Sequence, residues 1–266
     1  MGLNKKYEML VDYIESLESL VIAFSGGVDS SFLLRAAKDA LGDNCLALTI
    51  KAPFHPRWEI EEARALAREL DVKHIVLERD HIPQQIINNP GDRCYLCKKI
   101  IFQEILDFAR SNNYKYVADG SNFDDTKDYR PGMRALEELK VISPLLDIGF
   151  TKDEIRQMSR KLNLPTWDKP AYACLLTRIE HGQMITEVDL RKIERAESYI
   201  FSLGFPIARV RLHGQLARIE VAANRLEDLL KKEIIEKVIM NFKKIGFQYI
   251  TVDLEGYRMG SQNEVL

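Results

Sequence analysis

The sequence lacks the features of membrane-spanning, secreted and disordered proteins. No stretch approaches the roughly 20 consecutive apolar residues of a membrane span, and residues 1–18 mix lysines with carboxylates where a signal peptide would be apolar. Apolar residues make up 46% of the 266 residues and charged residues 29%, which excludes disorder as the main state. We expect a cytoplasmic globular protein that does not bind a membrane.

The sequence also lacks a surplus of basic residues. Lys and Arg number 38 against 40 Asp and Glu, which gives a formal net charge of −2. A dedicated nucleic-acid binder usually carries a basic surplus, so the charge balance argues against a nucleic-acid partner. At about 100–200 residues per domain, the length predicts one large domain or two ordinary ones.

Apolar runs alternate with amphipathic segments over residues 1–165. Short apolar runs predict strands, and a 3.6-residue period predicts helices between them. The predicted strands are Leu20–Phe24, Cys45–Ile50, Lys73–Leu77, Tyr114–Ala118 and Val141–Ile142, and the predicted helices are Asp29–Leu41, Pro56–Leu70, Tyr95–Ser111 and Thr151–Leu162, the last with a Thr151–Glu154 capping box. Repeated βα units predict an α/β fold with a parallel, doubly wound sheet.

The pattern changes after residue 165. Residues 166–185 have no clear period, which is typical of a functional loop or a linker. Residues 186–266 then predict a smaller α+β domain, with elements at Glu187–Leu203, Ile207–Leu212, Leu216–Val221, Arg225–Ile245 and Tyr249–Leu254. A turn at His213–Gln215 joins the first two of these strands. The predicted organisation is therefore a domain over 1–165, a loop over 166–185 and a domain over 186–266.

A glycine–serine loop follows the first predicted strand and leads into a helix. We call it the phosphate loop; its residues are Ser25, Gly26, Gly27, Val28, Asp29, Ser30 and Ser31. Glycines allow backbone N–H groups to approach a phosphate, and the helix N-terminus adds partial positive charge. The loop has neither the Gly-Lys-Ser/Thr of a Walker A motif nor a G-x-G-x-x-G fingerprint. A merely capped helix start is the alternative, and the strand–loop–helix context disfavours it.

A second polar segment, Asp-Gly-Ser-Asn at 119–122, follows the fourth predicted strand. Ligands of doubly wound folds bind at the carboxyl ends of the strands. We therefore expect Gly120 and Ser121 to help hold a nucleotide, although turn chemistry explains part of the segment. Asp124 and Asp125 are candidates for contact with Mg²⁺, a role that the sequence leaves open.

Three of the four cysteines need a chemical explanation. Cys94 and Cys97 form a Cys-x-x-Cys pair at the start of a predicted helix, beside basic residues that favour the thiolate. Cys174 lies in the loop over 166–185. Three thiolates can bind three irons of a [4Fe–4S] cluster and leave the fourth open, or bind zinc together with a histidine such as His81 or His181. Three unrelated thiols are the other alternative, and Cys45 begins an apolar strand and fits the core.

The phosphate loop resembles the SGGxDS loop of the PP-loop ATP pyrophosphatases, a family whose members cleave ATP between the α and β phosphates. Five segments in order along the chain resemble the LarE enzymes, which insert sulfur during synthesis of the nickel-pincer cofactor of lactate racemase. They are Ser25–Ser31, Asp92–Lys98 (DRCYLCK), Lys169–Arg178 (KPAYACLLTR), Arg209–Val221 (RVRLHGQLARIEV) and Asp253–Ser261.

The resemblance implies ATP, Mg²⁺ and a [4Fe–4S] cluster as cofactors. One LarE subclass has only the cysteine that matches Cys174 and sacrifices its sulfur. This chain adds Cys94 and Cys97 and so resembles the three-cysteine subclass, in which all three are cluster ligands and a spare sulfide sits on the open iron. Asp29, Cys174 and Arg178 are the expected catalytic residues.

The implied substrate is a pyridinium mononucleotide that carries two carboxylates and one phosphate. Arg209 and Arg211 share one face of a predicted strand, and with Arg178 they form a candidate anion clamp. The alternative is a solvated strand face paired with acids such as Glu220. Two further residues, Glu197 and Asp228, match acidic positions of the LarE site.

The sequence predicts an ATP-dependent sulfur transferase. ATP would adenylate a carboxylate, and sulfide would displace AMP to give a thiocarboxylate. The expected partners are the small-molecule substrate and a sulfide donor, and the chain is expected to form a homo-oligomer. The competing hypotheses are a tRNA thiolation enzyme with a [4Fe–4S] cluster and a nucleotide-binding metal sensor without turnover.

Overall fold

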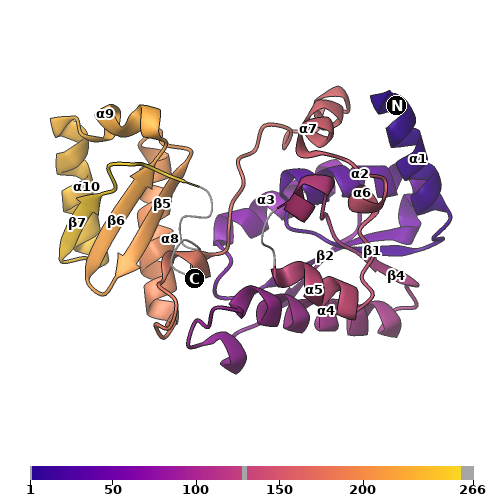
Figure 1. The fold of residues 1–266 in the computed structure, drawn as a ribbon, viewed down its shortest axis with the longest axis horizontal. Helices are drawn as coiled ribbons and strands as arrows, with labels where there is room; N and C mark the ends of the chain where they lie inside the picture. The colour runs from indigo at the N-terminus through magenta and orange to yellow at the C-terminus, as the bar shows by residue number, and fades with distance from the viewer. Residues whose placement is uncertain (1, 128–130, 259–266) are drawn as a thin grey trace. The chain divides into compact units, whose positions relative to one another are not determined.

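The chain divides into two compact units in a computed structural model that describes residues 2–127 and 131–258 (Figure 1). Unit 1 comprises Met1–His81 and Asp92–Tyr172, and unit 2 comprises Ile82–Gly91 and Ala173–Leu266. No sequence pattern indicates that Ile82–Gly91 belongs to unit 2. The last three residues of the Asp253–Ser261 motif lie outside the described residues.

Unit 1 contains a parallel four-stranded sheet. The strands are β1 (Leu20–Ala23), β2 (Cys45–Lys51), β3 (His74–Glu78) and β4 (Tyr116–Ala118), in the order β3-β2-β1-β4. The predicted parallel α/β fold is confirmed. The predicted fifth strand is wrong, because the chain there forms only a single bridge between Ile142 and Ala118 before Pro144 starts a helix.

Helices cover both faces of this sheet (Figure 1). They are α1 (Leu3–Glu15), α2 (Val28–Leu41), α3 (Arg57–Glu69), α4 (Arg93–Ser111), α5 (Pro131–Glu138), α6 (Pro144–Asp147) and α7 (Lys152–Lys161). Three of these helices, α1, α5 and α6, are not among the predicted elements. In the described part of the chain, no helix is both long and apolar enough to cross a membrane.

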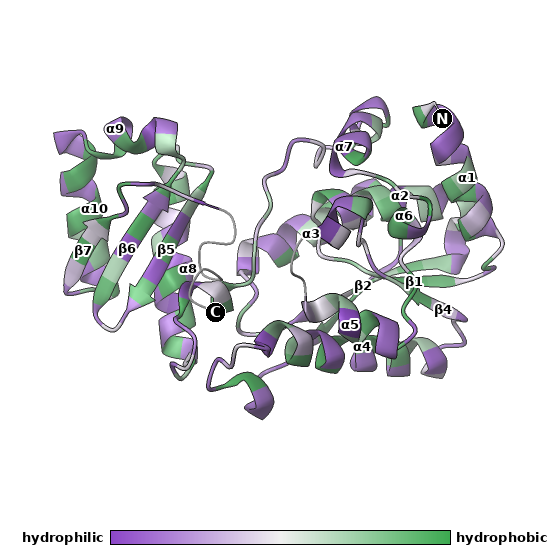
Figure 2. Ribbon diagram, viewed as in Figure 1, coloured by the Kyte–Doolittle hydropathy of each residue, from purple (hydrophilic) through white to green (hydrophobic). Residues whose placement is uncertain are grey.

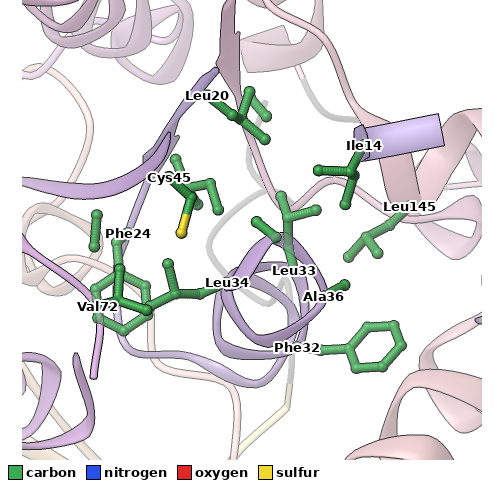
Figure 3. Close-up of a cluster of buried hydrophobic side chains, with 14 of the residues drawn as sticks. Ile14, Leu20, Phe24, Phe32, Leu33, Leu34, Ala36, Cys45, Val72 and Leu145 are labelled. Atoms are coloured by element: carbon green, nitrogen blue, oxygen red, sulfur yellow. The ribbon is translucent and has the colours of Figure 1, made fainter. Parts of the chain in front are cut away.

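Two apolar clusters hold unit 1 together. On one face, Phe32 and Leu33 of α2 pack among fully buried residues that include Leu20 of β1 (Figure 3). On the other, β1 and β2 pack against Phe102 and Ile105 of α4. The strand β1 contributes to both clusters and is apolar throughout, so it appears green in Figure 2. Burial on both faces explains why β1 lacks an alternating pattern.

The predicted capping box at α7 is confirmed. The side chain of Thr151 accepts a hydrogen bond from the Glu154 amide at 3.3 Å, and the Glu154 carboxylate accepts one from the Thr151 amide at 2.9 Å. These bonds satisfy N–H groups that a helix start leaves without intrahelical partners. They fix the backbone of Lys152, the first residue of α7, whose side chain pairs with Asp29 of the phosphate loop.

Unit 2 contains a mixed three-stranded sheet with helices, which confirms the predicted smaller α+β unit. The strands are β5 (Ala208–His213), β6 (Leu216–Val221) and β7 (Tyr249–Val252), with β5 and β6 antiparallel and β6 and β7 parallel. Gly214 has φ of +61° in the predicted turn between β5 and β6. Ile179 adds a parallel bridge to Leu212 at the β5 edge.

The helices of unit 2 are α8 (Glu187–Ser202), α9 (Leu226–Leu229) and α10 (Lys232–Ile245). The prediction of one helix over Arg225–Ile245 is wrong. Lys231 is extended, with ψ of 135°, and separates α9 from α10. The Asp228 carboxylate binds both Arg225 at 2.8 Å and Lys231 at 2.6 Å. These contacts lie at the interruption between α9 and α10, which the spacing of apolar residues does not indicate.

A buried polar chain ties the end of β1 to β3. The Thr49 hydroxyl donates to the Phe24 carbonyl at 2.5 Å and lies 2.8 Å from Nε2 of His74, so Nε2 carries the proton that it donates to the Thr49 oxygen. Burial lowers the pKa of His74 to about 4, helped by the nearby Arg64 charge. Burial also lowers the pKa of His55 to about 4.

These histidines make the stability of unit 1 depend on pH. Between pH 6.5 and about 4 the unfolded chain binds protons that the folded imidazoles do not, so the free energy of unfolding falls as the pH is lowered through this window. A His55→Gln/His74→Gln variant should show a weaker fall. Urea unfolding followed by the fluorescence of Trp58 and Trp167, which both lie in unit 1, measures it. An equal fall in both proteins would contradict the prediction.

Candidate functional site

The phosphate loop is packed tightly against its surroundings in unit 1. Gly26 has φ of +69°, and a Cβ there would lie 3.0 Å from the Cα of Ala63 in α3. Only glycine satisfies both the left-handed backbone and this approach. Gly27 is the N-cap of α2, and no side chain at this position caps the first amides of the helix. The Ser25 and Ser30 hydroxyls lie 3.1 Å apart across the loop.

The end of β4 meets the start of α2, as the sequence predicted for a site at the carboxyl ends of the strands. A Cβ on Gly120 would lie 3.0 Å from the Ser30 amide nitrogen. Asn122 donates to the Asp29 carboxylate at 3.3 Å, and Ser121 donates to Asp119 at 2.5 Å. The structure therefore brings Gly120 and Ser121 together with the phosphate loop.

Three lysines that are not among the predicted site residues lie around this loop. Lys152 of α7 pairs with Asp29, and Lys169 donates to the Gly26 carbonyl at 2.9 Å while pairing with Glu62 at 2.7 Å. Lys98 of α4 lies 3.8 Å from Asp119. Lys98 ends the DRCYLCK segment and Lys169 begins the KPAYACLLTR segment, whereas Lys152 lies in no quoted segment, and only the structure places all three around the loop. Together they supply positive charge that the loop itself lacks.

An apolar cavity opens beside Ser25 in unit 1. Its volume is about 270 Å³, and its walls include Leu48 and Ile50 of β2 and Ile101 and Phe102 of α4. A flat apolar group could enter it, with any attached phosphate at the loop. Lys98, which directly follows Cys97 in the chain, also lines this cavity.

The carboxylates of Asp124 and Asp125 fix the turn after β4. Asp124 accepts from the Lys152 amide at 2.8 Å, and Asp125 accepts from the Asn122 amide at 3.0 Å. The pKa of the Asp124 carboxyl is lowered, and the hydrogen bond from Lys127 makes the largest contribution. Across the described residues, no three His, Cys, Asp or Glu side chains are close enough to hold a metal ion.

All four cysteines are reduced thiols. In unit 1, Cys94 is exposed and Cys97 half-buried at the start of α4; in unit 2, Cys174 is half-buried and precedes a short 3₁₀ helix, η4 (Leu175–Arg178). Reduced, accessible thiols suit iron or zinc as ligands. Cys45 is 1% exposed, and burial raises the pKa of its thiol to about 11, which fits a core residue.

A buried ion pair fixes the segment that carries Cys174. The Cys174 carbonyl accepts from the Thr177 amide, the Thr177 hydroxyl and the Arg178 guanidinium, all within 3.1 Å. Arg178 is only 2% exposed and binds both carboxylate oxygens of Glu197, at 2.8 and 3.1 Å. Glu197 also accepts from the Val210 amide of β5 at 2.9 Å. Arg178 and Glu197 thus bind each other and hold Cys174 against the sheet of unit 2.

Arg209 and Arg211 lie on one face of β5, as predicted. With Arg218 and Glu220 of β6 they form a cluster that we call the arginine face. Arg211 binds Glu220 through two hydrogen bonds of 2.8 and 3.0 Å, and Arg218 shares the same carboxylate at 3.1 Å. The Arg209 guanidinium lies 4.8 Å from the centre of the Tyr257 ring. The pairing with Glu220 that the sequence raised as an alternative is present, but it is buried rather than solvated.

Asp228 has a different environment from the arginine face. It lies on α9 and binds Arg225 and Lys231. Hydrogen bonds from Lys231, which makes the larger contribution, and from Arg225 lower the pKa of the Asp228 carboxyl.

Comparison with known proteins places this architecture in a family. A family model described as NAD synthase matches residues 3–105. The pyridinium-3,5-bisthiocarboxylic acid mononucleotide synthase of Lactiplantibacillus plantarum is 35% identical over 99% of this chain and 96% of its own. An uncharacterized protein of Synechocystis is 38% identical over 99% of this chain and 99% of its own. An uncharacterized protein of Methanocaldococcus jannaschii is 36% identical over 91% of this chain and 91% of its own. The chain therefore belongs to the LarE family of PP-loop enzymes, the family of the pyridinium-3,5-bisthiocarboxylic acid mononucleotide synthase.

Proposed function

We propose that this protein is an ATP-dependent sulfur transferase that acts on a pyridinium-3,5-biscarboxylic acid mononucleotide and contributes to synthesis of a nickel-pincer cofactor. It would adenylate a substrate carboxylate, release pyrophosphate and exchange the activated oxygen for sulfur supplied by an external donor. The full-length similarity to the L. plantarum synthase supports the substrate class. Within the structure, the observation that carries the proposal is the apolar cavity that opens at the phosphate loop.

ATP fits this arrangement as a ligand. The adenine ring would occupy the cavity between β2 and α4, and the phosphates would lie along the amides of the phosphate loop and the start of α2. Lys152 and Lys169 reach the loop from outside and would neutralise phosphate charge. In the free protein these ammonium groups bind Asp29 and the Gly26 carbonyl, which keeps them in position before ATP arrives.

Asp29 would act on the phosphates through Mg²⁺ and Lys152. Its carboxylate lies at the first turn of α2, where Lys152 and Asn122 orient it. Carboxylate oxygens and phosphate oxygens are the usual Mg²⁺ ligands. Attack of the substrate carboxylate on the α-phosphate forms an acyl adenylate and expels pyrophosphate. The amides and hydroxyls of the loop would stabilise the charge that builds up on that leaving group.

Removal of the Asp29 carboxylate should abolish pyrophosphate formation. We expect AMP and pyrophosphate from the wild-type protein with substrate, and a loss of 10²-fold or more in Asp29→Ala, about the scale for one transition-state contact. Asp43→Ala is the matched control, because that carboxylate is 99% exposed on the surface. Pyrophosphate release and chromatography of the nucleotides measure both. Formation of ADP and orthophosphate would refute the assignment.

The sulfur step would depend on Cys94, Cys97 and Cys174. Their thiols are reduced and accessible, which suits a [4Fe–4S] cluster with three protein ligands. When bound, such a cluster offers one open iron at which sulfide can be held. Sulfide attack on the acyl adenylate forms a C–S bond, breaks the C–O bond to AMP and yields the thiocarboxylate. Arg178 and Glu197 would act as positioning residues, because Arg178 donates to the Cys174 carbonyl and Glu197 orients the Arg178 guanidinium.

Each of the three cysteines should be needed for iron binding. After anaerobic reconstitution the wild-type protein should hold about four irons per chain, by the [4Fe–4S] assignment. Cys94→Ser, Cys97→Ser and Cys174→Ser should each lower both iron content and sulfur transfer. Cys45→Ser is the matched control and should retain both, since Cys45 lies in the core of unit 1. Intact mass after several turnovers should be unchanged. A loss of one H₂S from the Cys174 peptide would instead establish a sacrificial cysteine.

The arginine face would bind the anionic groups of the substrate. Arg209, Arg211 and Arg218 carry three positive charges around the single carboxylate of Glu220 and the nearby Asp253, which lies 3.5 Å from Arg218. Directly opposed like charges such as Arg211 and Arg218 are unfavourable in a sheet, and a bound phosphate or carboxylate would relieve their repulsion.

Neutralising one buried pair of the arginine face should weaken substrate binding selectively. An Arg211→Gln/Glu220→Gln variant removes the guanidinium without leaving an unpaired buried carboxylate. We expect a loss of about 1.5–3 kcal/mol in affinity for the mononucleotide, the scale of a hydrogen bond to a charged group. ATP affinity should not change, because the nucleotide cavity lies within unit 1. Arg191→Gln/Glu194→Gln is the matched control, because it neutralises another ion pair of unit 2 whose arginine is more exposed. Calorimetry that shows equal losses for ATP and substrate would contradict the assignment.

A further inference from the structure

We propose that Glu62 is a positioning residue that holds the Lys169 ammonium beside the phosphate loop in the free protein and exchanges it with pyrophosphate. When ATP binds, Lys169 passes from Glu62 to the β- and γ-phosphates, and Glu62 takes it back as pyrophosphate leaves. The inference rests on the proposed nucleotide site. It adds an acidic residue of α3 that lies outside every motif of the sequence analysis, and both members of the pair belong to unit 1.

The Lys169 ammonium has two acceptors among the residues that the structure describes. It donates to the Gly26 carbonyl of the phosphate loop at 2.9 Å, and it lies 2.7 Å from a carboxylate oxygen of Glu62. The Lys169 side chain is 15% exposed, whereas that of Glu62 is 53% exposed. A largely buried ammonium needs an anionic partner, but a half-exposed carboxylate can be solvated by water when it is released. The lysine is therefore the fixed member of the pair, and the glutamate is the member that can leave.

The backbone on both sides of the pair is held independently of it. Arg156 of α7 donates to the Lys169 carbonyl at 2.8 Å. Ala63, which follows Glu62 in α3, lies so close to Gly26 that a Cβ on the glycine would be 3.0 Å from the alanine Cα. An exchange of partners therefore needs only side-chain rotations of Lys169 and Glu62, with α3 and the phosphate loop in place.

A cavity beside Gly26 determines from which side an anion can reach Lys169. The cavity has a volume of about 350 Å³, and its walls include the carboxylates of Glu62, Glu69 and Asp168, with Lys169 as the one cation among its described lining residues. Phosphate is disfavoured among these acids, because like charges repel. The ammonium should therefore meet phosphate on the side of the Gly26 carbonyl, where the proposed mechanism puts the pyrophosphate group.

The exchange implies a gain of affinity when the Glu62 charge is removed. In the free protein, the Glu62 carboxylate and the phosphates compete for one ammonium, so the free energy of the existing ion pair is subtracted from that of nucleotide binding. Ion pairs with an exposed partner are weak, so the competition should lower affinity by about two- to fivefold and not by orders of magnitude. A residue that merely supported the fold would give the opposite sign, because its loss would loosen the site.

Equilibrium binding to the full chain tests the inference. Calorimetry at one Mg²⁺ concentration compares the wild type with Glu62→Gln for three probes, namely α,β-methylene-ATP, inorganic pyrophosphate and AMP. The methylene group prevents cleavage between the α- and β-phosphates. We expect Glu62→Gln to bind the ATP analogue and pyrophosphate about two- to fivefold more tightly. AMP affinity should not change, because AMP lacks the pyrophosphate group.

Two further variants separate the exchange from a general effect of charge. Glu61→Gln removes the same charge from the neighbouring position, where the carboxylate is 73% exposed and lies 3.8 Å from Arg64, and it should bind all three probes as the wild type does. Lys169→Met should weaken pyrophosphate binding. In that background Glu62→Gln should have no further effect, because residues that act through one contact are not additive. Urea unfolding of each variant checks that the chain remains folded.

Unchanged or weaker pyrophosphate binding in Glu62→Gln would overturn the exchange. An equal gain in Glu61→Gln, or a gain that persists without Lys169, would also overturn it, since either result indicates a general effect of charge.

These outcomes are separate from sulfur transfer, which the formation of thiocarboxylate measures. Tighter pyrophosphate binding in Glu62→Gln of a protein that forms no thiocarboxylate would support the exchange and reject the proposed transfer. A wild-type protein that binds none of the three probes would refute the nucleotide site and the exchange with it.

Discussion

Close backbone packing around the phosphate loop is the constraint on which the rest of unit 1 depends. Gly26 approaches the backbone of Ala63, and Gly120 approaches the amide of Ser30, each to the limit that a side-chain carbon would violate. These two contacts join the loop to α3 and to the end of β4. Because protein interiors are close-packed and tolerate little change in volume, the loop, the apolar cavity and the polar turn after β4 must move together or not at all.

The positively charged side chains around this rigid loop belong to elements that follow it in the chain. Lys152 is the first residue of α7, where the capping box fixes the backbone, and Lys169 lies just beyond the same helix. Arg156 of α7 donates to the carbonyls of Trp167 and Lys169, at 2.7 and 2.8 Å. The helix α7 thus orders the segment that leads toward Cys174 and supplies charge to the loop. These side chains place positive charge beside the phosphate loop although the loop itself contains no lysine.

Unit 2 depends on buried ion pairs in place of a tight loop. Arg178 with Glu197, and Arg211 with Glu220, are nearly inaccessible to solvent and use bidentate geometry. Breaking such a pair by removing one partner leaves a buried charge, which costs several kcal/mol. The guanidinium groups also hold backbone carbonyls of the Cys174 segment, namely those of Ala173, Cys174 and Thr177. Arg178 and Arg211, which the sequence predicted as part of a substrate clamp, thus also hold the backbone of the segment that carries Cys174.

Features that depend on neighbouring residues along the chain could be predicted from the sequence alone. Apolar runs located the four strands of unit 1 to within two residues, Thr151 and Glu154 marked the start of α7, and the glycines of the phosphate loop marked a tight turn. The order of motifs was sufficient to indicate the family. Local periodicity failed where side-chain contacts interrupt it, as at Lys231, and where a short run lacks a full strand partner, as at Ile142.

Contacts between residues that are distant in the chain could be identified only in the folded structure. Lys98, Lys152 and Lys169 gather around one loop, and Glu197 and Glu220 turn out to be the partners of the arginines. Asn89 carries no signal in the sequence, yet its buried amide assigns a ten-residue segment, Ile82–Gly91, to unit 2. The physical reason is the same in each case. A lysine, a carboxylate or an amide has no periodicity of its own, and its role is fixed by the donor or acceptor that the folded backbone places within about 3 Å of it.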